Sequence, residues 1–297
     1  MKITFLGTGS MLPTENRNLS SILLSYENEN ILFDCAEGTQ RQLKIAKISP
    51  TKITKILISH WHSDHVLGIP GLLQTIAAFS PRKTIEIFGP IGTKKFMDLI
   101  QKMFIPRHNI NIKINEIAKK GKIFDTRKFC LEASYLDHTS KCLGFSFIEK
   151  NKRKINIEYL KKFGLKSSPI LKELQEGKSI VYKNKKISPD KATTIIKGRK
   201  ITILLDTRYC KNAIDLAKNS TLLITEAMFL ENLKNLAKEY GHLTAKQASL
   251  IAKRANAEQL ILTHLSQRYK TTNDIEKEAR KIFKNTEIAK DLLSISL

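Results

Sequence analysis

The sequence is poor in cysteine, which limits the cross-links it can form. Its four cysteines (Cys35, Cys130, Cys142 and Cys210) are scattered along 297 residues and form no C-x-x-C pair. This spacing argues against a zinc ribbon and against a thioredoxin-type redox site. We therefore expect reduced, mostly buried thiols, as in other cytosolic chains.

Long apolar runs are also missing. After Lys2, only ITFL is apolar before Gly7, and this is too short for the apolar region of a signal peptide. The longest apolar stretch, residues 66–79, contains glycine, proline and glutamine and is too short to span a bilayer. The sequence predicts a globular, cytoplasmic protein with no membrane partner.

Acidic residues are scarce relative to basic ones. The chain has 51 lysines and arginines against 28 acidic residues, a formal net charge of +23. Residues 149–200 hold 16 of the basic and 5 of the acidic residues, a net charge of +11. Lysine drift in an AT-rich genome would spread the charge more evenly, so we interpret this segment as facing a polyanion. Its two short helical patterns, at 157–163 and 169–176, carry few large apolar residues, which predicts that it projects from the body.

The remaining apolar patterns predict alternating strands and helices. The predicted strands are residues 2–6, 21–25, 30–33, 53–59, 84–88, 128–135, 142–148, 200–205, 221–225 and 259–263, followed by a last strand at the C-terminus. The predicted helices are residues 37–46, 68–79, 93–103, 212–218, 229–238, 244–255 and 273–283. This order is typical of two sheets flanked by helices, an α/β sandwich.

The stretch SHWHSDHVLG places four metal-ligand residue types within six positions: His60, His62, Asp64 and His65. If the strand ends at His60, then His60 and His62 face the same side, because alternate residues of an extended chain point the same way. The chain then turns toward the helix at Gly68, which lets Asp64 and His65 face a neighbouring position. Imidazole and carboxylate ligands suit Zn²⁺, Mn²⁺ or Fe²⁺. A lone histidine is usually a surface residue, but this cluster predicts a metal site.

Further ligand types follow apolar runs elsewhere in the chain. His138, Asp206 and His264 each come after a predicted strand, where side chains from different strands can converge. Glu226 also ends an apolar run, and a carboxylate there could orient an imidazole. His242 lies at a helix start with Thr244 as N-cap, so both a capping and a catalytic role remain open. His108 has no such context and is interpreted as an ordinary loop residue.

Several motifs together are similar to a known family. FLGTGSMLPTENRNLSSILL, FDCAEGTQRQL, ISHWHSDHVLGIPGLL, LLDTRYC, TEAMF, GHLTAKQA and LTHLSQRY resemble ribonuclease Z, the tRNA 3′-processing endonuclease of the metallo-β-lactamase superfamily. The resemblance implies one catalytic domain over residues 1–297, an αββα sandwich. It also implies an inserted, flexible basic arm at about residues 150–180, which would bind tRNA as an exosite.

The resemblance further implies roles for individual residues. Asp64 would accept a proton, and His242, oriented by Glu226, would donate one. Two Zn²⁺ ions per subunit are implied, with Mn²⁺ as a possible substitute. The implied ligands are His60, His62 and His138 for one ion, Asp64, His65 and His264 for the other, and Asp206 as a bridge. The implied substrate-binding residues are Arg17 and Asn18 in the loop 13–18, and Lys152, Arg153, Lys154, Lys161, Lys162 and Lys166 in the arm.

The function implied is removal of 3′ trailers from precursor tRNA by a homodimer. The cut would leave a 3′-hydroxyl on the tRNA and a 5′-phosphate on the trailer. The alternatives are a phosphodiesterase or sulfatase of the same fold that acts on small molecules, and a non-catalytic RNA-binding module. The basic segment and the pair Glu226 and His242 favour RNA cleavage over the first alternative. The complete ligand set argues against the second.

Overall fold

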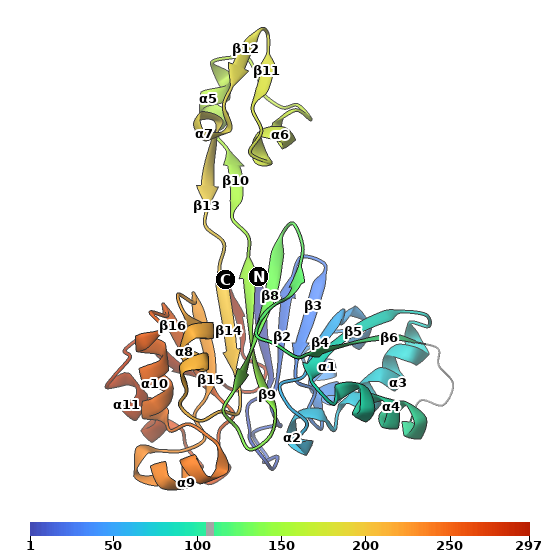
Figure 1. The fold of residues 1–297 in the computed structure, drawn as a ribbon, viewed down its shortest axis with the longest axis vertical. Helices are drawn as coiled ribbons and strands as arrows, with labels where there is room; N and C mark the ends of the chain where they lie inside the picture. The colour runs from blue at the N-terminus through green and yellow to red at the C-terminus, as the bar shows by residue number, and fades with distance from the viewer. Residues whose placement is uncertain (105–109) are drawn as a thin grey trace.

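The computed structural model describes residues 1–104 and 110–297, so the predicted loop residue His108 lies outside the described residues. Two large sheets face each other, helices cover their outer surfaces, and a narrow arm projects from one end (Figure 1). The predicted αββα sandwich is confirmed. Among the described residues, no helix is long and apolar enough to cross a bilayer. All four cysteines are free thiols, and three of them are buried.

The first sheet carries its helices on the side that faces away from the second sheet. Its strands are, in order across the sheet, β18 (Ser294–Ser296), β1 (Lys2–Gly7), β2 (Ser21–Tyr26), β3 (Glu29–Phe33), β4 (Lys55–Leu57), β5 (Thr84–Pro90) and β6 (Asn111–Ile117). The helices on this side are α1 (Thr39–Ile45), η1 (Pro50–Lys52), α2 (Ser63–Val66), α3 (Ile69–Phe79) and α4 (Thr93–Phe104).

The second sheet is built in the same way. Its strands are, in order, β17 (Thr286–Ile288), β16 (Gln259–Thr263), β15 (Leu222–Glu226), β14 (Lys200–Leu204), β9 (Cys142–Glu149), β8 (Phe129–Leu136) and β7 (Gly121–Asp125). The helices are α8 (Lys211–Ala217), η2 (Glu231–Leu233), α9 (Lys234–Tyr240), α10 (Ala245–Arg254) and α11 (Asn273–Arg280). β14, β15 and β16 run parallel, so their carboxyl ends lie at the same edge.

Apolar residues alternate between two cores because each strand is covered on both faces. In β1, Ile3 and Phe5 point into the layer between the sheets, where Phe145 and Phe147 of β9 meet them. Leu6 points the other way, against the helices of the first sheet. Strands buried on both faces are apolar almost throughout, which is why the sequence revealed most of them.

Some predicted elements differ from the structure. The strand predicted at 53–59 contains only β4, because residues 50–52 form the η1 turn and the chain leaves the sheet after Leu57. The helix predicted at 229–238 begins later, as η2 and then α9. No strand was predicted for β6, for β7 or within the projecting arm, and a single last strand was predicted where the structure has β17 and β18.

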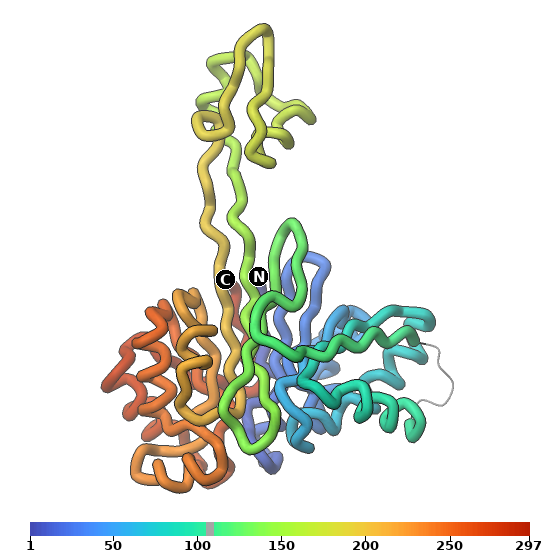
Figure 2. Tube along the Cα trace, in the orientation of Figure 1, coloured from blue at the N-terminus to red at the C-terminus, as the bar shows by residue number. Residues whose placement is uncertain are grey.

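The arm consists of a two-stranded stalk and a small head (Figure 2). The strand β10 (Lys152–Ile155) pairs antiparallel with β13 (Thr193–Ile196) to form the stalk. The projecting segment therefore runs to about residue 196, beyond the expected limit of 180. The head contains α5 (Ile157–Lys161), α6 (Leu171–Gln175), β11 (Ile180–Tyr182), β12 (Lys185–Ile187) and α7 (Pro189–Ala192).

The head has a hydrophobic core of its own. Leu160, Leu174, Ile180 and Ile187 are buried in one cluster that is separate from the cores of the body. The arm projects as predicted, but the reason differs, since its apolar residues bury one another instead of being absent.

Candidate metal centre

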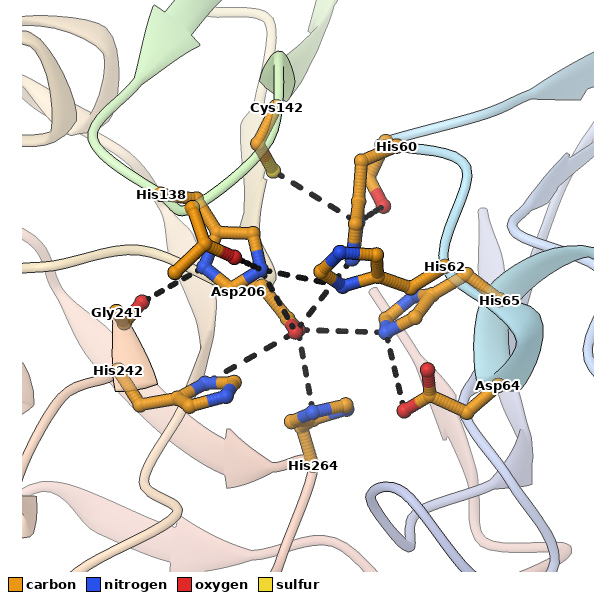
Figure 3. A network of polar contacts seen from close by, with 12 residues as sticks. His60, His62, Asp64, His65, His138, Cys142, Asp206, Gly241, His242 and His264 are labelled. Atoms are coloured by element: carbon orange, nitrogen blue, oxygen red, sulfur yellow. Dashed lines mark hydrogen bonds and ion pairs between the residues drawn. The ribbon is translucent and has the colours of Figure 1, made fainter. Parts of the chain in front are cut away.

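The predicted metal ligands converge at one edge of the sandwich (Figure 3). His138 lies two residues after β8, Asp206 two residues after β14, and His264 directly after β16. His60 and His62 also meet, but the predicted reason was wrong. The strand β4 ends at Leu57, and an irregular segment before α2 brings the two rings together.

Asp206 lies between two groups of ligands, and its two carboxylate oxygens face different groups. Oδ2 lies 3.6 Å from Nε2 of His60 and 3.7 Å from Nε2 of His138. Nε2 of His138 lies in turn 3.4 Å from Nδ1 of His62. These four residues form one potential metal site.

The second group surrounds the other oxygen of Asp206. Oδ1 lies 3.1 Å from Nε2 of His264 and 3.4 Å from Nε2 of His65. Nε2 of His65 is 3.5 Å from Oδ2 of Asp64. Asp64, His65 and His264 form a second potential metal site, and a third possible set joins Asp206, His242 and His264. The assignment of ligands to two ions that the sequence resemblance implies stays a prediction.

The spacing and the unpaired atoms both fit bound metal ions. Zinc with ligands at about 2.0–2.2 Å in a tetrahedron places neighbouring donor atoms about 3.3–3.6 Å apart. The distances above lie in or near this range. In addition, Nε2 of His60, Nε2 of His65 and Oδ1 of Asp206 are buried and have no hydrogen-bond partner among the described residues. Buried polar atoms are rarely left unpaired, so a cation is the natural partner for this cluster.

The electrostatics of His60 and Asp206 also favour a cation, whereas at His65 the carboxylates of Asp206 and Asp34 outweigh burial and raise the pKa of the imidazole well above its ordinary value. Burial and the neighbouring His65 lower the pKa of His60 well below its ordinary value, which leaves a neutral imidazole with a free lone pair. Burial alone would raise the pKa of Asp206, but the surrounding imidazoles hold it well below its usual range. A neutral imidazole and a charged carboxylate are the forms that bind metal.

The far nitrogens of three ligands are fixed by hydrogen bonds. Nδ1 of His65 lies 2.6 Å from Oδ2 of Asp34, and Nδ1 of His264 lies 2.8 Å from Oγ of Ser20. Nδ1 of His138 donates to the carbonyl of Gly241 at 2.9 Å. Such bonds set the tautomer and leave Nε2 to face the metal.

Asp34 contacts the candidate ligand His65, and the sequence reasoning missed it. Its carboxylate is fully buried, and it accepts hydrogen bonds from the backbone N–H and the hydroxyl of Ser59 at 2.7 and 2.6 Å. Asp34 directly follows β3, so it obeys the rule that identified His138, Asp206 and His264. That rule would have found it.

His242 and Glu226 form a buried pair beside the ligands. Nδ1 of His242 lies 3.1 Å from both carboxylate oxygens of Glu226, and Glu226 accepts a further bond from the backbone N–H of Thr207 at 2.7 Å. Burial lowers the pKa of His242, but the Glu226 and Asp206 carboxylates outweigh it and raise that pKa to about 9. The predicted N-cap, Thr244, is confirmed as part of a capping box. Glu226 thus orients the imidazole of His242 and favours its protonated form.

These residues face a cavity of about 480 Å³. Its wall includes Met11, Asp64, His138, His242, His264 and Arg268. The backbone N–H of Met11 donates to Oδ2 of Asp64 at 2.9 Å, so the segment before the 13–18 loop contacts a predicted metal ligand directly. A cavity of this kind can hold one phosphodiester group between metal ions and an acid.

Comparisons with known proteins agree with this geometry. A family model described as Anti-Pycsar protein Apyc1 matches residues 1–102, less than half of the chain. The ribonuclease Z of Protochlamydia amoebophila (strain UWE25) is 41% identical over 292 residues, which cover 98% of this chain and 95% of that protein. This chain belongs to the ribonuclease Z family.

Solved structures confirm the fold. The structure of human tRNase Z, short form, matches with a TM-score of 0.74 and 30% identity, and covers 100% of this chain and 99% of that one. YhfI of Bacillus subtilis, described as a metallo-beta-lactamase fold protein, matches with a TM-score of 0.72, covering 99% and 98% of the two chains. At 20% identity it shows the fold alone. The predicted metallo-β-lactamase fold is therefore confirmed.

Two predicted substrate-binding residues of this family member are engaged inside the protein. The guanidinium of Arg17 donates to the carbonyls of Ser266 and Tyr269 at 3.3 and 2.8 Å. The side chain of Asn18 donates to the carbonyl of Glu37 at 2.9 Å, and its backbone N–H donates to Asp291 at 2.7 Å. In this structure both residues hold the 13–18 loop in place.

The predicted arm residues divide into two groups. Lys152 forms an ion pair with Glu149 at 2.9 Å, and Arg153 forms one with Asp190 at 3.0 Å, so these two charges are already balanced. Lys161 pairs loosely with Glu158 on the surface of the head, at 3.6 Å. Lys154, Lys162 and Lys166 make no ion pair with the described residues and are exposed.

Removing the charge of Asp34 should weaken metal binding although Asp34 is not itself a ligand. In Asp34→Asn, His65 loses the carboxylate that fixes its Nδ1, and such changes typically reduce metal affinity by about 10–100-fold. Competition with a chelator measures this, and the single tryptophan, Trp61, lies between two predicted ligands and offers a fluorescence signal. The exposed Asp274→Asn in α11 is the control. Equal zinc affinity of the two variants would contradict the assignment.

Proposed function

We propose that this chain is a zinc-dependent endoribonuclease that removes 3′ trailers from precursor tRNA. The observation that carries the proposal is the complete set of metal donors beside the His242–Glu226 pair, in a protein with a basic projecting arm. The kinship with ribonuclease Z proteins supports it. One Zn²⁺ would be held by His60, His62 and His138, the other by Asp64, His65 and His264, with Asp206 between them. Mn²⁺ suits the same nitrogen and oxygen donors.

Each residue near the cavity has a distinct part in hydrolysis. Zn²⁺ held by these residues would lower the pKa of a water molecule in the cavity and so supply a nucleophile at neutral pH. The Asp64 carboxylate, held by the Met11 N–H, can orient that water and accept its proton. His242 can donate a proton to the departing 3′-oxygen, because Glu226 favours the protonated form of its imidazole. The products are a tRNA 3′-hydroxyl and a trailer with a 5′-phosphate.

The decisive experiment is incubation of the zinc-loaded protein with a 3′-extended precursor tRNA, followed by mapping of the new ends. We expect one cut at the trailer junction, and Asp64→Ala should abolish it while leaving tRNA binding near normal. Binding is measured separately by a gel-shift titration. Turnover of small phosphodiesters without any cut in the tRNA would favour the small-molecule phosphodiesterase instead.

His242→Asn should slow cleavage without loss of metal. A positioned general acid contributes about 10²–10⁴-fold, so kcat should fall by that order while the bound zinc, measured by mass spectrometry, stays constant. Zinc loss in His242→Asn would reassign His242 as a ligand.

Glu226→Gln should remove the charge that raises the pKa of His242. The protonated form of His242 would then be lost at a lower pH, so the alkaline limb of the pH profile of kcat should move to lower pH.

The position of the arm supports the proposed homodimer. β9 begins at Cys142, whose Sγ is 3.9 Å from Nδ1 of His60, and ends at Glu149, where the arm leaves the body. Seven residue steps along the strand, or about 24 Å, thus separate the arm from the metal centre. The arm leaves the body at one end of β9 (Figure 1), and the candidate metal centre lies at the other end, beside Cys142. One RNA can therefore meet an arm and a metal centre more easily when they belong to different subunits.

An apolar helical surface offers an interface for that dimer. α3 and α4 contact each other and expose Phe79, Leu99, Met103 and Phe104, of which Phe79 is 78% and Met103 70% exposed. Patches of this kind often mark protein interfaces. Sedimentation equilibrium tests the proposal, and a monomer at all concentrations would refute it.

Removing the arm should separate RNA recognition from chemistry. If residues 152–196 are replaced by a short glycine-serine linker, binding of precursor tRNA should weaken strongly, while turnover of a small phosphodiester should persist. The binding of the intact protein should also fall with salt, with a slope of about −0.7 to −0.9 per phosphate contact, and the slope should decrease when the arm is removed. An equal loss of both activities would mean that the arm is needed for folding.

A further inference from the structure

The joint between the arm and the body is organised around one buried carboxylate. Glu149 is the last residue of β9, and only 7% of its surface is exposed. Its Oε1 accepts hydrogen bonds from the Tyr26 hydroxyl at 3.0 Å and from Nζ of Lys152 at 2.9 Å. Its Oε2 accepts one from Nε of Arg199 at 2.8 Å. The three donors come from the facing sheet, the outgoing stalk strand and the returning chain.

The backbone around Glu149 is irregular, which makes this contact important. The ladder between β9 and β14 ends at the pair Ile148 and Lys200, and the stalk ladder begins at Lys152 and Ile196. The residues between the two ladders form a break in an otherwise continuous pair of strands. A break of this kind can bend unless other contacts hold it.

Three contacts besides the carboxylate close the break. The backbone N–H of Glu149 donates to the carbonyl of Arg199 at 2.8 Å, and the N–H of Gly198 donates to Oδ1 of Asn151 at 2.9 Å. The returning chain also passes very close to β9, because a Cβ placed on Gly198 would lie 1.9 Å from the carbonyl oxygen of Glu149. Only glycine permits this approach.

The charge of Glu149 is held firmly at the joint. Burial would raise the pKa of its carboxyl, but the hydrogen bonds from Arg199, Lys152 and Tyr26 outweigh burial and lower that pKa to about 2. Lys152 also lies over the ring of Tyr26, 5.1 Å from its centroid, and Tyr26 packs edge-on against Phe147 in the core. The stalk is thereby tied to the rigid interior of the sandwich.

We propose that Glu149 is a positioning residue that fixes the direction in which the arm leaves the body. By tying Lys152, Arg199 and Tyr26 together, it holds the head in the orientation in which the head meets the RNA. This role rests on the proposed function only in its effect on cleavage, since the direction of the arm is a property of the free protein. Without Glu149, the joint is flexible in the free protein and becomes ordered only when RNA binds. The free energy lost in that ordering weakens RNA binding and leaves the rate of the chemical step unchanged.

Glu149→Gln tests the proposal because it removes the charge and keeps the size of the side chain. We expect faster hydrogen exchange in β10 and β13, unchanged exchange in β15 and β16, and a wider range of arm orientations in small-angle X-ray scattering. With precursor tRNA, KM should rise by roughly 3- to 10-fold while kcat stays constant. Turnover of a small phosphodiester should not change. Gly198→Ala, which displaces the returning strand, should have the same effects.

Glu158→Gln is the matched control. Glu158 lies on the head, its side chain is 90% exposed, and it pairs with Lys161, so this variant changes the net charge by the same amount without touching the joint. If Glu149→Gln and Glu158→Gln show the same exchange in β10 and β13 and the same KM, the proposal is overturned. If the wild-type protein does not cut precursor tRNA, the proposed function fails, but exchange and scattering still decide whether Glu149 orients the arm.

Discussion

The site depends on one buried charge, the carboxylate of Asp206. Each of its oxygens faces a separate group of ligands, so a single side chain sets how the two groups lie relative to each other. A buried carboxylate is unfavourable unless positive charge or hydrogen bonds compensate it. Here the imidazoles stabilise it only in part, since Oδ1 has no hydrogen-bond donor among the described residues. The hydrogen bonds within the cluster therefore leave part of the Asp206 charge unsatisfied, and bound cations would satisfy it.

The sheet explains why these residues meet. Asp206, Glu226 and His264 lie at or just beyond the carboxyl ends of three parallel strands that are neighbours in the second sheet. Parallel strands end at one edge, so residues far apart in the sequence come together there. The first sheet supplies His60 and Asp34 to the same edge, after β4 and β3. The metal centre thus bridges the two sheets, and both must fold before it exists.

The same rule explains how much the sequence could reveal. Ligand-type residues after apolar runs were found because a buried strand is visible as a run of apolar residues, and Asp34 would have been found in the same way. The stalk strands were not found, because the sequences KRKI of β10 and TTII of β13 show no alternation of apolar and polar residues. The contacts of Lys152 and Arg153 depend on the pairing of β10 with β13, which the sequence did not predict. Arg153 contacts Asp190 and Thr193, about 40 residues away, only because β10 and β13 lie side by side.

Charge alone cannot select a cleavage site on RNA. A protein with a net charge of +23 attracts any polyanion, and such attraction carries no sequence or shape information. Selection requires that basic groups and the metal centre keep a set separation. In this fold, β9 and β14 have the candidate metal centre at one end and the arm at the other. The arm is connected to these strands only through the joint at residues 149–151 and 197–199, so this joint determines how rigidly the arm is held. If the lysines of the head bind RNA as proposed, they can orient it toward the candidate metal centre only as precisely as that joint fixes the direction of the arm.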